Sequence, residues 1–316
     1  MIKPVKQVIC TDTKDKDTRE RESAIINQYD LHAKVYAQEI KENSLQSDSF
    51  YFLLNLIREV KGDLSGGVWL DAGCGPGCFS GSIFNLNYTK LIGVDLSSEM
   101  IKIARTKEVY SEVHKSSLTD LSMITKCGVS VYFSNNVFHF LNAMGEEYLD
   151  TALSEAGKVI KDNGLLAINL SSTGTSDEFV SAYRKVIHKK MQDYGVYDPA
   201  TNPLGIKTEL IRDYPIGSID LKNMVNKLKV KGFRIVKALK RYEPIPYSDR
   251  KDYVRNMSTY AKHLYLVPFV HLCEDVQDHI FEEMVDIFLK DGPEGPFVND
   301  HFMNYVLAIK CPDTER

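Results

Sequence analysis

The sequence predicts an α/β protein with a doubly wound, mostly parallel sheet that carries helices on both faces. Between residues 67 and 171, apolar segments rich in β-branched residues alternate with segments of helical periodicity. Such alternation is typical of a parallel sheet covered on both sides. A glycine-rich turn, "GCGPG" at 73–77, directly follows the first apolar segment. A turn of this kind between a strand and a helix is typical of a cofactor site at the carboxyl edge of the sheet.

The first elements are two helices and a strand. Residues 25–40 place apolar side chains at helical spacing, and a second helix at 49–60 ends at "KGDLSGG". Further along come strands at 68–72, 90–96, 111–116, 129–135 and 165–171, and helices at 78–86, 97–107 and 147–164, the last closed by Gly164. Residues 10–23 are almost wholly polar and are expected to form a mobile tail or a solvated helix start.

The second half of the sequence no longer shows the regular alternation of strand and helix patterns. A helix at 219–230 precedes a strand at 232–243, and largely helical sequence at 248–290 precedes a final strand at 302–311. We therefore expect four regions: a tail and capping helix at 1–45, an α/β core at 46–242 with an insertion at about 171–215, a helical lid at 243–300, and the last core strand at 301–316.

Composition and charge narrow the possible partners. The 316 residues carry a net charge of −4, so no basic surplus indicates nucleic-acid binding. No apolar stretch reaches the roughly 20 residues of a membrane span, and the opening "MIKPVKQVIC" lacks the apolar core of a secretory signal. We expect a cytoplasmic chain with six free cysteines, no metal site, no membrane contact and no nucleic-acid partner. The oligomeric state stays open.

The glycine turn indicates the kind of ligand. Glycines at 73, 75 and 77 let backbone amides approach either a dinucleotide or a nucleoside cofactor with an amino-acid tail. The dinucleotide fingerprint needs a third glycine where this chain has Cys78. The carboxylate of Asp71 would repel a pyrophosphate but attract an ammonium and a sulfonium. The turn therefore favours a cationic cofactor.

Asp95 ends the next strand, "LIGVDL". A carboxylate at that position can accept hydrogen bonds from both hydroxyls of a ribose. The alternative is that Asp95 only caps the helix that begins near Ser97.

Four segments together resemble the class I S-adenosylmethionine-dependent methyltransferases: "LDAGCGPG", "LIGVDLSSEMIKIAR", "VYFSNNVFHFL" and "VIKDNGLLAINL". The resemblance extends over about residues 67–170, and the overall layout is most similar to the small-molecule members. It implies a Rossmann-like, seven-stranded sheet with an N-terminal helical cap and a helical lid. It also implies a set of residues that bind S-adenosylmethionine: Tyr36, Asp71, Gly73, Cys74, Gly75, Gly77, Asp95, Leu96, Met100, Ser117, Leu118 and Asn135.

The resemblance implies metal-independent, in-line transfer of a methyl group to an oxygen or nitrogen of a small-molecule acceptor, with S-adenosyl-L-homocysteine as product. His139 follows the fourth strand and is the candidate general base, and Tyr29 lies on the helix expected to cover the sulfonium. Each could instead be a packing residue. An acidic acceptor would pair with an arginine such as Arg241 or Arg255.

Three other functions stay open. The first is methylation of a protein or nucleic acid, although "SNNV" lacks the proline and aromatic residues typical of enzymes that methylate base amino groups. The second is an NAD-dependent dehydrogenase. The third is a non-catalytic scaffold that binds the cofactor.

Overall fold

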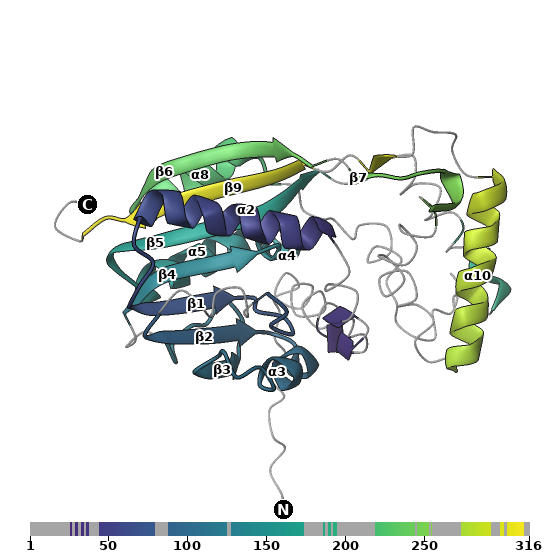
Figure 1. Ribbon diagram of the computed structural model, residues 1–316, viewed down its shortest axis with the longest axis horizontal. Coiled ribbons are helices and arrows are strands. Elements are labelled where there is room, and N and C mark those ends of the chain that lie inside the picture. The colour runs from purple at the N-terminus through teal and green to yellow at the C-terminus, as the bar shows by residue number, and fades with distance from the viewer. Residues whose placement is uncertain are drawn as a thin grey trace, which may run out of the picture.

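The computed structural model describes a seven-stranded sheet, the helices packed on it and parts of the chain beyond it (Figure 1). The described residues are 26, 29–30, 33–34, 36–37, 44–79, 88–124, 128–173, 186, 189–190, 192–194, 219–243, 245–252, 254, 273–291, 298–299 and 302–312. Within these ranges, no helix has both the length and the apolar character that crossing a membrane would require.

The strands of the sheet lie in the order β3-β2-β1-β4-β5-β9-β6. Their bounds are β1 Val68–Ala72, β2 Lys90–Asp95, β3 Glu112–Lys115, β4 Val129–Asn135, β5 Ile160–Thr173, β6 Phe233–Tyr242 and β9 Phe302–Lys310. Neighbouring strands from β3 to β5 pair in parallel, whereas β9 is antiparallel to both β5 and β6. The predicted mostly parallel sheet is confirmed.

The pairing directions place most strand ends at one edge. Because β9 is antiparallel to both of its neighbours, β6 runs in the same direction as β5. The carboxyl ends of β1, β2, β4, β5 and β6 therefore share the edge on the right in Figure 1. Open α/β sheets bind their ligands outside this edge.

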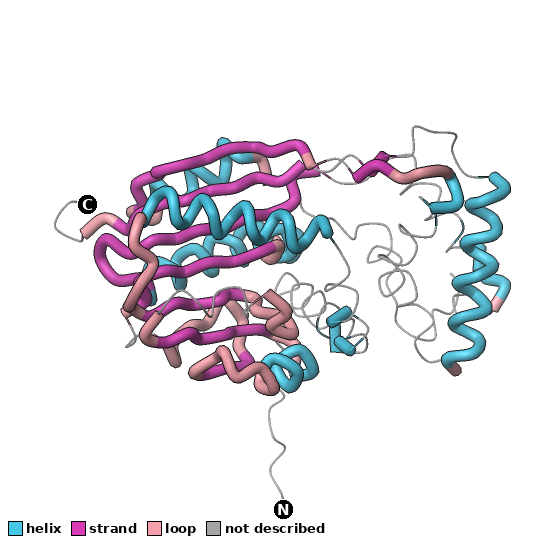
Figure 2. The backbone as a smooth tube through the Cα atoms, in the orientation of Figure 1, coloured by secondary structure: helices cyan, strands magenta, loops and turns pink. Residues whose placement is uncertain are grey.

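Helices cover both faces of the sheet, as Figure 2 shows. Their bounds are α2 Ser44–Lys61, α3 Ser98–Ala104, α4 Phe138–Met144, α5 Glu146–Val159, α8 Leu221–Val230 and α10 Glu274–Asp291. On one face, α2 buries Leu53 and Ile57 against Trp69, Phe133 and Tyr305 of the strands. The opposite face carries α4, α5 and α8 over a second apolar cluster.

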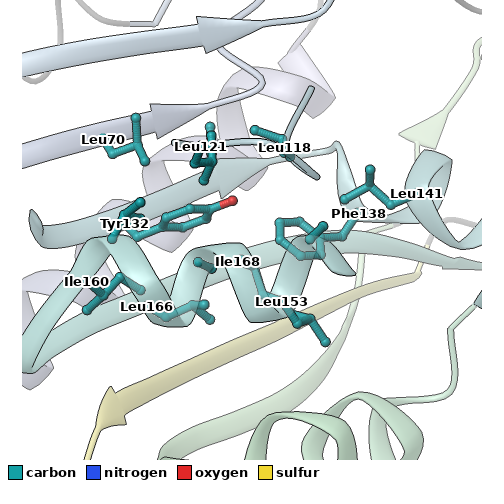
Figure 3. Packing of buried hydrophobic residues seen from close by; sticks show 14 of the residues in the cluster. Leu70, Leu118, Leu121, Tyr132, Phe138, Leu141, Leu153, Ile160, Leu166 and Ile168 are labelled. Atoms are coloured by element: carbon teal, nitrogen blue, oxygen red, sulfur yellow. The ribbon is translucent and has the colours of Figure 1, made fainter. Parts of the chain in front are cut away.

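The second cluster shows how the strands alternate between the two cores. Tyr132 of β4 points to the side of α5 and lies among Leu70, Ile168 and Leu153 (Figure 3). Its neighbours Val131 and Phe133 pack on the α2 side. Both faces of β4 are thus apolar, which is the pattern of a central strand in a parallel sheet.

One predicted boundary is wrong. The helix predicted at 147–164 is α5, which ends at Val159 rather than at Gly164. Ile160 is already extended and pairs with Val129 of β4. The chain then turns at Asn163, whose φ is +59°. A Cβ at Gly164 would lie 2.9 Å from the carbonyl oxygen of Val129, so this glycine permits close strand packing instead of ending a helix.

Most other described elements match the prediction to within a few residues, but α2 begins at Ser44 rather than at residue 49, and the short helix α4 was not expected. The predicted tail at 10–23 lies outside the described residues, as does nearly all of the helix expected at 78–86. The lid and the four predicted regions stay predictions. Within the expected lid, α10 lies beyond the carboxyl edge of the sheet in Figure 1. A short ribbon, β7 Ile245–Pro246 with β8 Val298–Asn299, was not expected.

Candidate functional site

The glycine turn after β1 holds left-handed backbone at three positions. The φ angles of Gly73, Gly75 and Gly77 are +78°, +51° and +72°, a region that residues with a side chain rarely adopt. A Cβ at Gly73 would lie 2.3 Å from a methyl carbon of Val137. A Cβ at Gly75 would meet no described atom within 4 Å. Gly73 is therefore needed for packing, whereas Gly75 leaves its backbone open to a ligand.

Asp95 ties this turn to the loop after β2. Its Oδ2 accepts a hydrogen bond from the amide of Gly75, and its Oδ1 accepts one from the amide of Ser97, both at 2.9 Å. Burial raises the pKa of the Asp95 carboxyl, and these amide donors act in the opposite direction. Each carboxylate oxygen has a second lone pair, so Asp95 can still accept from a ligand's hydroxyls.

Asp71 is the second carboxylate of the site and is only 8% exposed. The hydroxyl of Tyr110 donates to its Oδ2 at 2.7 Å. Burial raises the pKa of Asp71 to about 7, opposed by the Tyr110 hydrogen bond and reinforced by the charge of Asp95. Across the described ranges, neither aspartate forms an ion pair with a lysine, arginine or histidine. A cationic ligand would supply the missing positive charge.

A cavity with an empty volume of about 460 Å³, including its open part, lies over the turn. One side is polar and the other is aromatic, with the rings of Phe50 and Phe79 stacked at 5.1 Å. The lining residues are Tyr36, Phe50, Asp71, Gly73, Cys74, Gly75, Pro76, Cys78, Phe79, Phe133, Asn135 and Asn136.

Asn135 is held in the cavity wall by a buried residue of β5. The amide nitrogen of Asn169 donates to Asn135 Oδ1 at 2.7 Å, and the oxygen of Asn169 accepts from the backbone amide of Asn136 at 2.8 Å. Asn136 has a φ of +59°, so this hydrogen bond supports a strained turn. Asn169 thereby fixes the end of β4.

The described part of the N-terminal helix docks on the same edge. Tyr29 makes edge-to-face contacts with Tyr36 at 5.4 Å and with Phe140 at 5.7 Å. The carboxylate of Asp30 accepts hydrogen bonds from the hydroxyl of Ser97 and from the amide of Glu99. The helix is thus attached to the loop that carries Asp95.

The structure brings seven of the predicted cofactor residues together. Tyr36, Asp71, Gly73, Cys74, Gly75 and Asn135 line the cavity, and Asp95 bonds to its turn. The remaining ones lie around this group. Gly77 closes the turn by donating to the carbonyl of Cys74 at 3.0 Å.

Met100 and Leu118 are buried, Leu96 is half-buried, and the hydroxyl of Ser117 bonds to that of Thr119 at 2.8 Å. Leu118 belongs to the apolar cluster on the α5 side. Their predicted contacts with the adenine stay predictions.

The predicted catalytic residues stay predictions as well. His139 is buried in α4, with its ring 4.1 Å from that of Phe140. Neither His139 nor Tyr29 is among the described residues that line the cavity.

Several residues of the site were not predicted from the sequence. Tyr110 lies outside the four segments that carry the family resemblance, and Asp30 contacts Ser97, 67 positions later in the chain. Phe50 and Phe79 show no pattern beyond helix amphipathicity or loop position. Asn169 did offer a signal, because a polar residue within the buried strand "LLAINLS" needs a hydrogen-bond partner.

Part of the chain is similar to a known family of domains. Residues 70–168 match a family model described as a methyltransferase domain. Over these residues the chain is similar to the methyltransferase domain family. The matched residues begin in β1 and end in β5, so the methyltransferase domain includes the glycine turn, Asp95 and Asn135.

Two curated relatives are similar over about half of the chain. The malonyl-[acyl-carrier protein] O-methyltransferase of Hamiltonella defensa subsp. Acyrthosiphon pisum is 26% identical over 164 residues, which are 52% of this chain and 58% of that protein. The enzyme of the same name from Yersinia pestis is 28% identical over 150 residues, 45% of this chain and 54% of that protein. The chain thus spans little more than half the length of these relatives.

Among solved structures, the [4+2]-cyclase SpnF resembles the chain with a TM-score of 0.50 and 16% identity. The match covers 91% of this chain and 95% of SpnF. This likeness confirms the fold of the methyltransferase domain. Since SpnF is named for a cyclisation, the fold by itself does not specify methyl transfer.

The glycine turn of the methyltransferase domain permits a direct comparison of two substitutions. Gly73→Ala is expected to lower the free energy of unfolding by about 3–5 kcal/mol, because it adds backbone strain to a steric clash with Val137. Gly75→Ala has no such clash and is expected to cost only about 1–2 kcal/mol. It should nevertheless abolish cofactor binding, because its methyl group occupies the open cradle.

Urea unfolding and calorimetry of both variants test this pair of effects. Equal stability of the two variants, or unchanged cofactor affinity in Gly75→Ala, would contradict the roles given to the two glycines.

Proposed function

We propose that this chain is an S-adenosylmethionine-dependent methyltransferase that acts on an oxygen or nitrogen of a small-molecule acceptor and releases S-adenosyl-L-homocysteine. The observation that carries the proposal is the pair Asp71 and Asp95 beside an open glycine cradle, with no ion-pair partner among the described residues. A cationic amino-acid tail and a ribose supply the partners that these carboxylates need.

The residues present fit this cofactor. Asp71 would hold its ammonium group, Asp95 its ribose hydroxyls, and the aromatic rings of the cavity would surround the less polar part. When bound, S-adenosylmethionine supplies a methyl group activated on a sulfonium. The chain's own contribution is then to align the acceptor and exclude water, which can lower a barrier by roughly 7–11 kcal/mol.

The alternatives fit less well. A dinucleotide would bring its pyrophosphate close to the buried carboxylate of Asp71, which is unfavourable.

The relatives' names favour one second candidate, an acyl group carried on a carrier protein. Incubation with labelled S-adenosylmethionine tests both acceptor classes, with a metabolite extract in one arm and malonyl-acyl-carrier protein in the other. Binding of the cofactor without label transfer in either arm would favour the alternative of a non-catalytic scaffold that binds the cofactor.

His139 provides a test of catalysis separate from binding. If it removes a proton from the acceptor, His139→Gln should lower turnover by about 10²–10⁴-fold. The affinity for S-adenosylmethionine should change by less than about twofold, since His139 does not line the described cavity. Turnover is measured by label transfer and affinity by calorimetry. Wild-type turnover in the variant would make His139 a packing residue.

A further inference from the structure

A buried carboxylate, that of Glu243, lies outside the cavity over the glycine turn. Glu243 follows β6 and is only 7% exposed. Its Oε1 accepts a hydrogen bond from the hydroxyl of Tyr305 at 2.6 Å and lies 3.2 Å from Nη1 of Arg241. Its Oε2 is equally buried and has no hydrogen-bond partner among the described residues. A buried carboxylate oxygen without a donor is costly, which suggests that a ligand supplies one.

Glu243 lies on the same face of the sheet as α2. The ring of Tyr305 packs against the ring of Phe52 of α2, with 4.8 Å between the ring centres. The guanidinium of Arg241 lies 4.3 Å from the centre of the Phe52 ring. Asp48 of α2 also acts electrostatically on Glu243. The carboxylate therefore lies between the end of β6 and the N-terminal half of α2.

A row of polar side chains connects this carboxylate to the cofactor cavity. Asn169 holds Asn135 in the cavity wall, and the next strand places Tyr305 directly opposite Asn169. Tyr305 in turn reaches Glu243. Opposite residues of an antiparallel pair project to the same face, so these side chains form one continuous row at the ligand-binding edge.

The same row contains the buried hydroxyl of a second residue, Ser171. The hydroxyl of Ser171 has no hydrogen-bond partner among the described residues. Ser171 is two positions beyond Asn169 on β5, and both Ser171 and Arg241 lie opposite Met303. Ser171 therefore lies on the α2 face of the sheet, at the same cross-strand position as Arg241, the ion-pair partner of Glu243.

Strand spacing sets the length of such a ligand. β4 and β6 are separated by three strand spacings, which amount to about 14 Å. A ligand that reaches from the end of β4 to the end of β6 must therefore extend about 14 Å along the edge of the sheet. Glu243 is too far from the end of β4 to act on the methyl-accepting atom, but it can recognise the opposite end of the acceptor.

We propose that Glu243 is a specificity-determining residue that accepts a hydrogen bond from an ammonium or hydroxyl group at the far end of an elongated acceptor. The inference rests on the proposed methyltransferase function and adds a substrate class to it. An acceptor with a carboxylate at that end would need a cationic partner there. Arg241 is already paired with Glu243 and stacked on Phe52, so such an acceptor is disfavoured.

Three probes with the same eight-carbon chain and the same amine test this specificity: 1,8-diaminooctane, 8-aminooctanol and 8-aminooctanoate. Their binding is measured by calorimetry with S-adenosyl-L-homocysteine present. The wild type should bind the diamine and the amino alcohol at least about tenfold more tightly than the amino acid. Glu243→Gln should reduce this preference to less than about threefold and leave the affinity for S-adenosyl-L-homocysteine unchanged.

Glu59→Gln is the matched control. Glu59 is an exposed glutamate of α2 that forms an ion pair with Lys237 of β6, the strand that Glu243 follows. It should bind all three probes like the wild type. Equal responses to the three probes, including no response to any, would contradict the inference. So would a fall of more than about 5 °C in the melting temperature of Glu243→Gln, because Glu243 would then be a structural residue. Failure of the wild type to bind S-adenosyl-L-homocysteine would instead contradict the proposed function.

Discussion

Replacing Asp95 with alanine is expected to weaken the binding of S-adenosylmethionine by at least about tenfold, and by up to about 10³-fold. The substitution removes the proposed hydrogen bonds to the ribose, each of which is worth about 1.5–3 kcal/mol when the acceptor is charged. It also frees the amides of Gly75 and Ser97, so the glycine turn loses its connection to the loop after β2. Calorimetric titration of the purified variant measures the change.

Asp120→Ala is a suitable control. Asp120 also accepts a hydrogen bond from an amide two residues later, but it is exposed and lies outside the cavity lining. The control should bind S-adenosylmethionine like the wild type. An Asp95→Ala variant with wild-type affinity would leave Asp95 only its role as a structural cap.

Asp71→Asn is expected to lower the affinity for S-adenosylmethionine by about 10–100-fold at pH 7.5. Asparagine can still accept the hydrogen bond from Tyr110, but it cannot pair with an ammonium. Because the free protein holds the pKa of Asp71 near 7, cofactor binding to the wild type must displace a proton at lower pH. The wild-type affinity should therefore fall by about fivefold to tenfold from pH 7.5 to pH 6. This pH dependence should be absent from Asp71→Asn.

The same substitution should stabilise the ligand-free protein above neutral pH. A carboxyl whose pKa is raised by folding stabilises the folded state below its unfolded pKa of about 3.9, and this contribution is lost as the pH rises through about 7. At pH 8 the wild type must keep a buried, ionised carboxylate, whereas the variant keeps a neutral amide. The melting temperature of Asp71→Asn at pH 8 should be higher by about 2–4 °C. A lower value would make Asp71 a structural residue.

The main features of the site were predictable because each depends on a local pattern. Asp71 and Asp95 end two strands with continuous apolar runs, and the carboxyl ends of parallel strands meet at one edge. The glycine spacing and the carboxylate of Asp71 together predicted a cationic ligand in preference to a dinucleotide.

Residues that depend on tertiary packing were not predictable in this way. Tyr110 reaches Asp71 from a loop 39 positions away, and Asp30 reaches Ser97 from another helix. Glu243 shows no local pattern, because its burial depends on Tyr305 from a strand 62 positions later. The error at Gly164 has a similar origin, since pairing of Ile160 with β4 ends the helix earlier than a glycine stop would.

Parallel calorimetric titrations of the wild-type chain with S-adenosylmethionine and with NAD⁺ at pH 7.5 test the central claim most directly. The account predicts saturable, one-to-one binding of S-adenosylmethionine and binding of NAD⁺ at least about 10²-fold weaker, because Asp71 repels the pyrophosphate. Tighter binding of NAD⁺ than of S-adenosylmethionine would contradict the account.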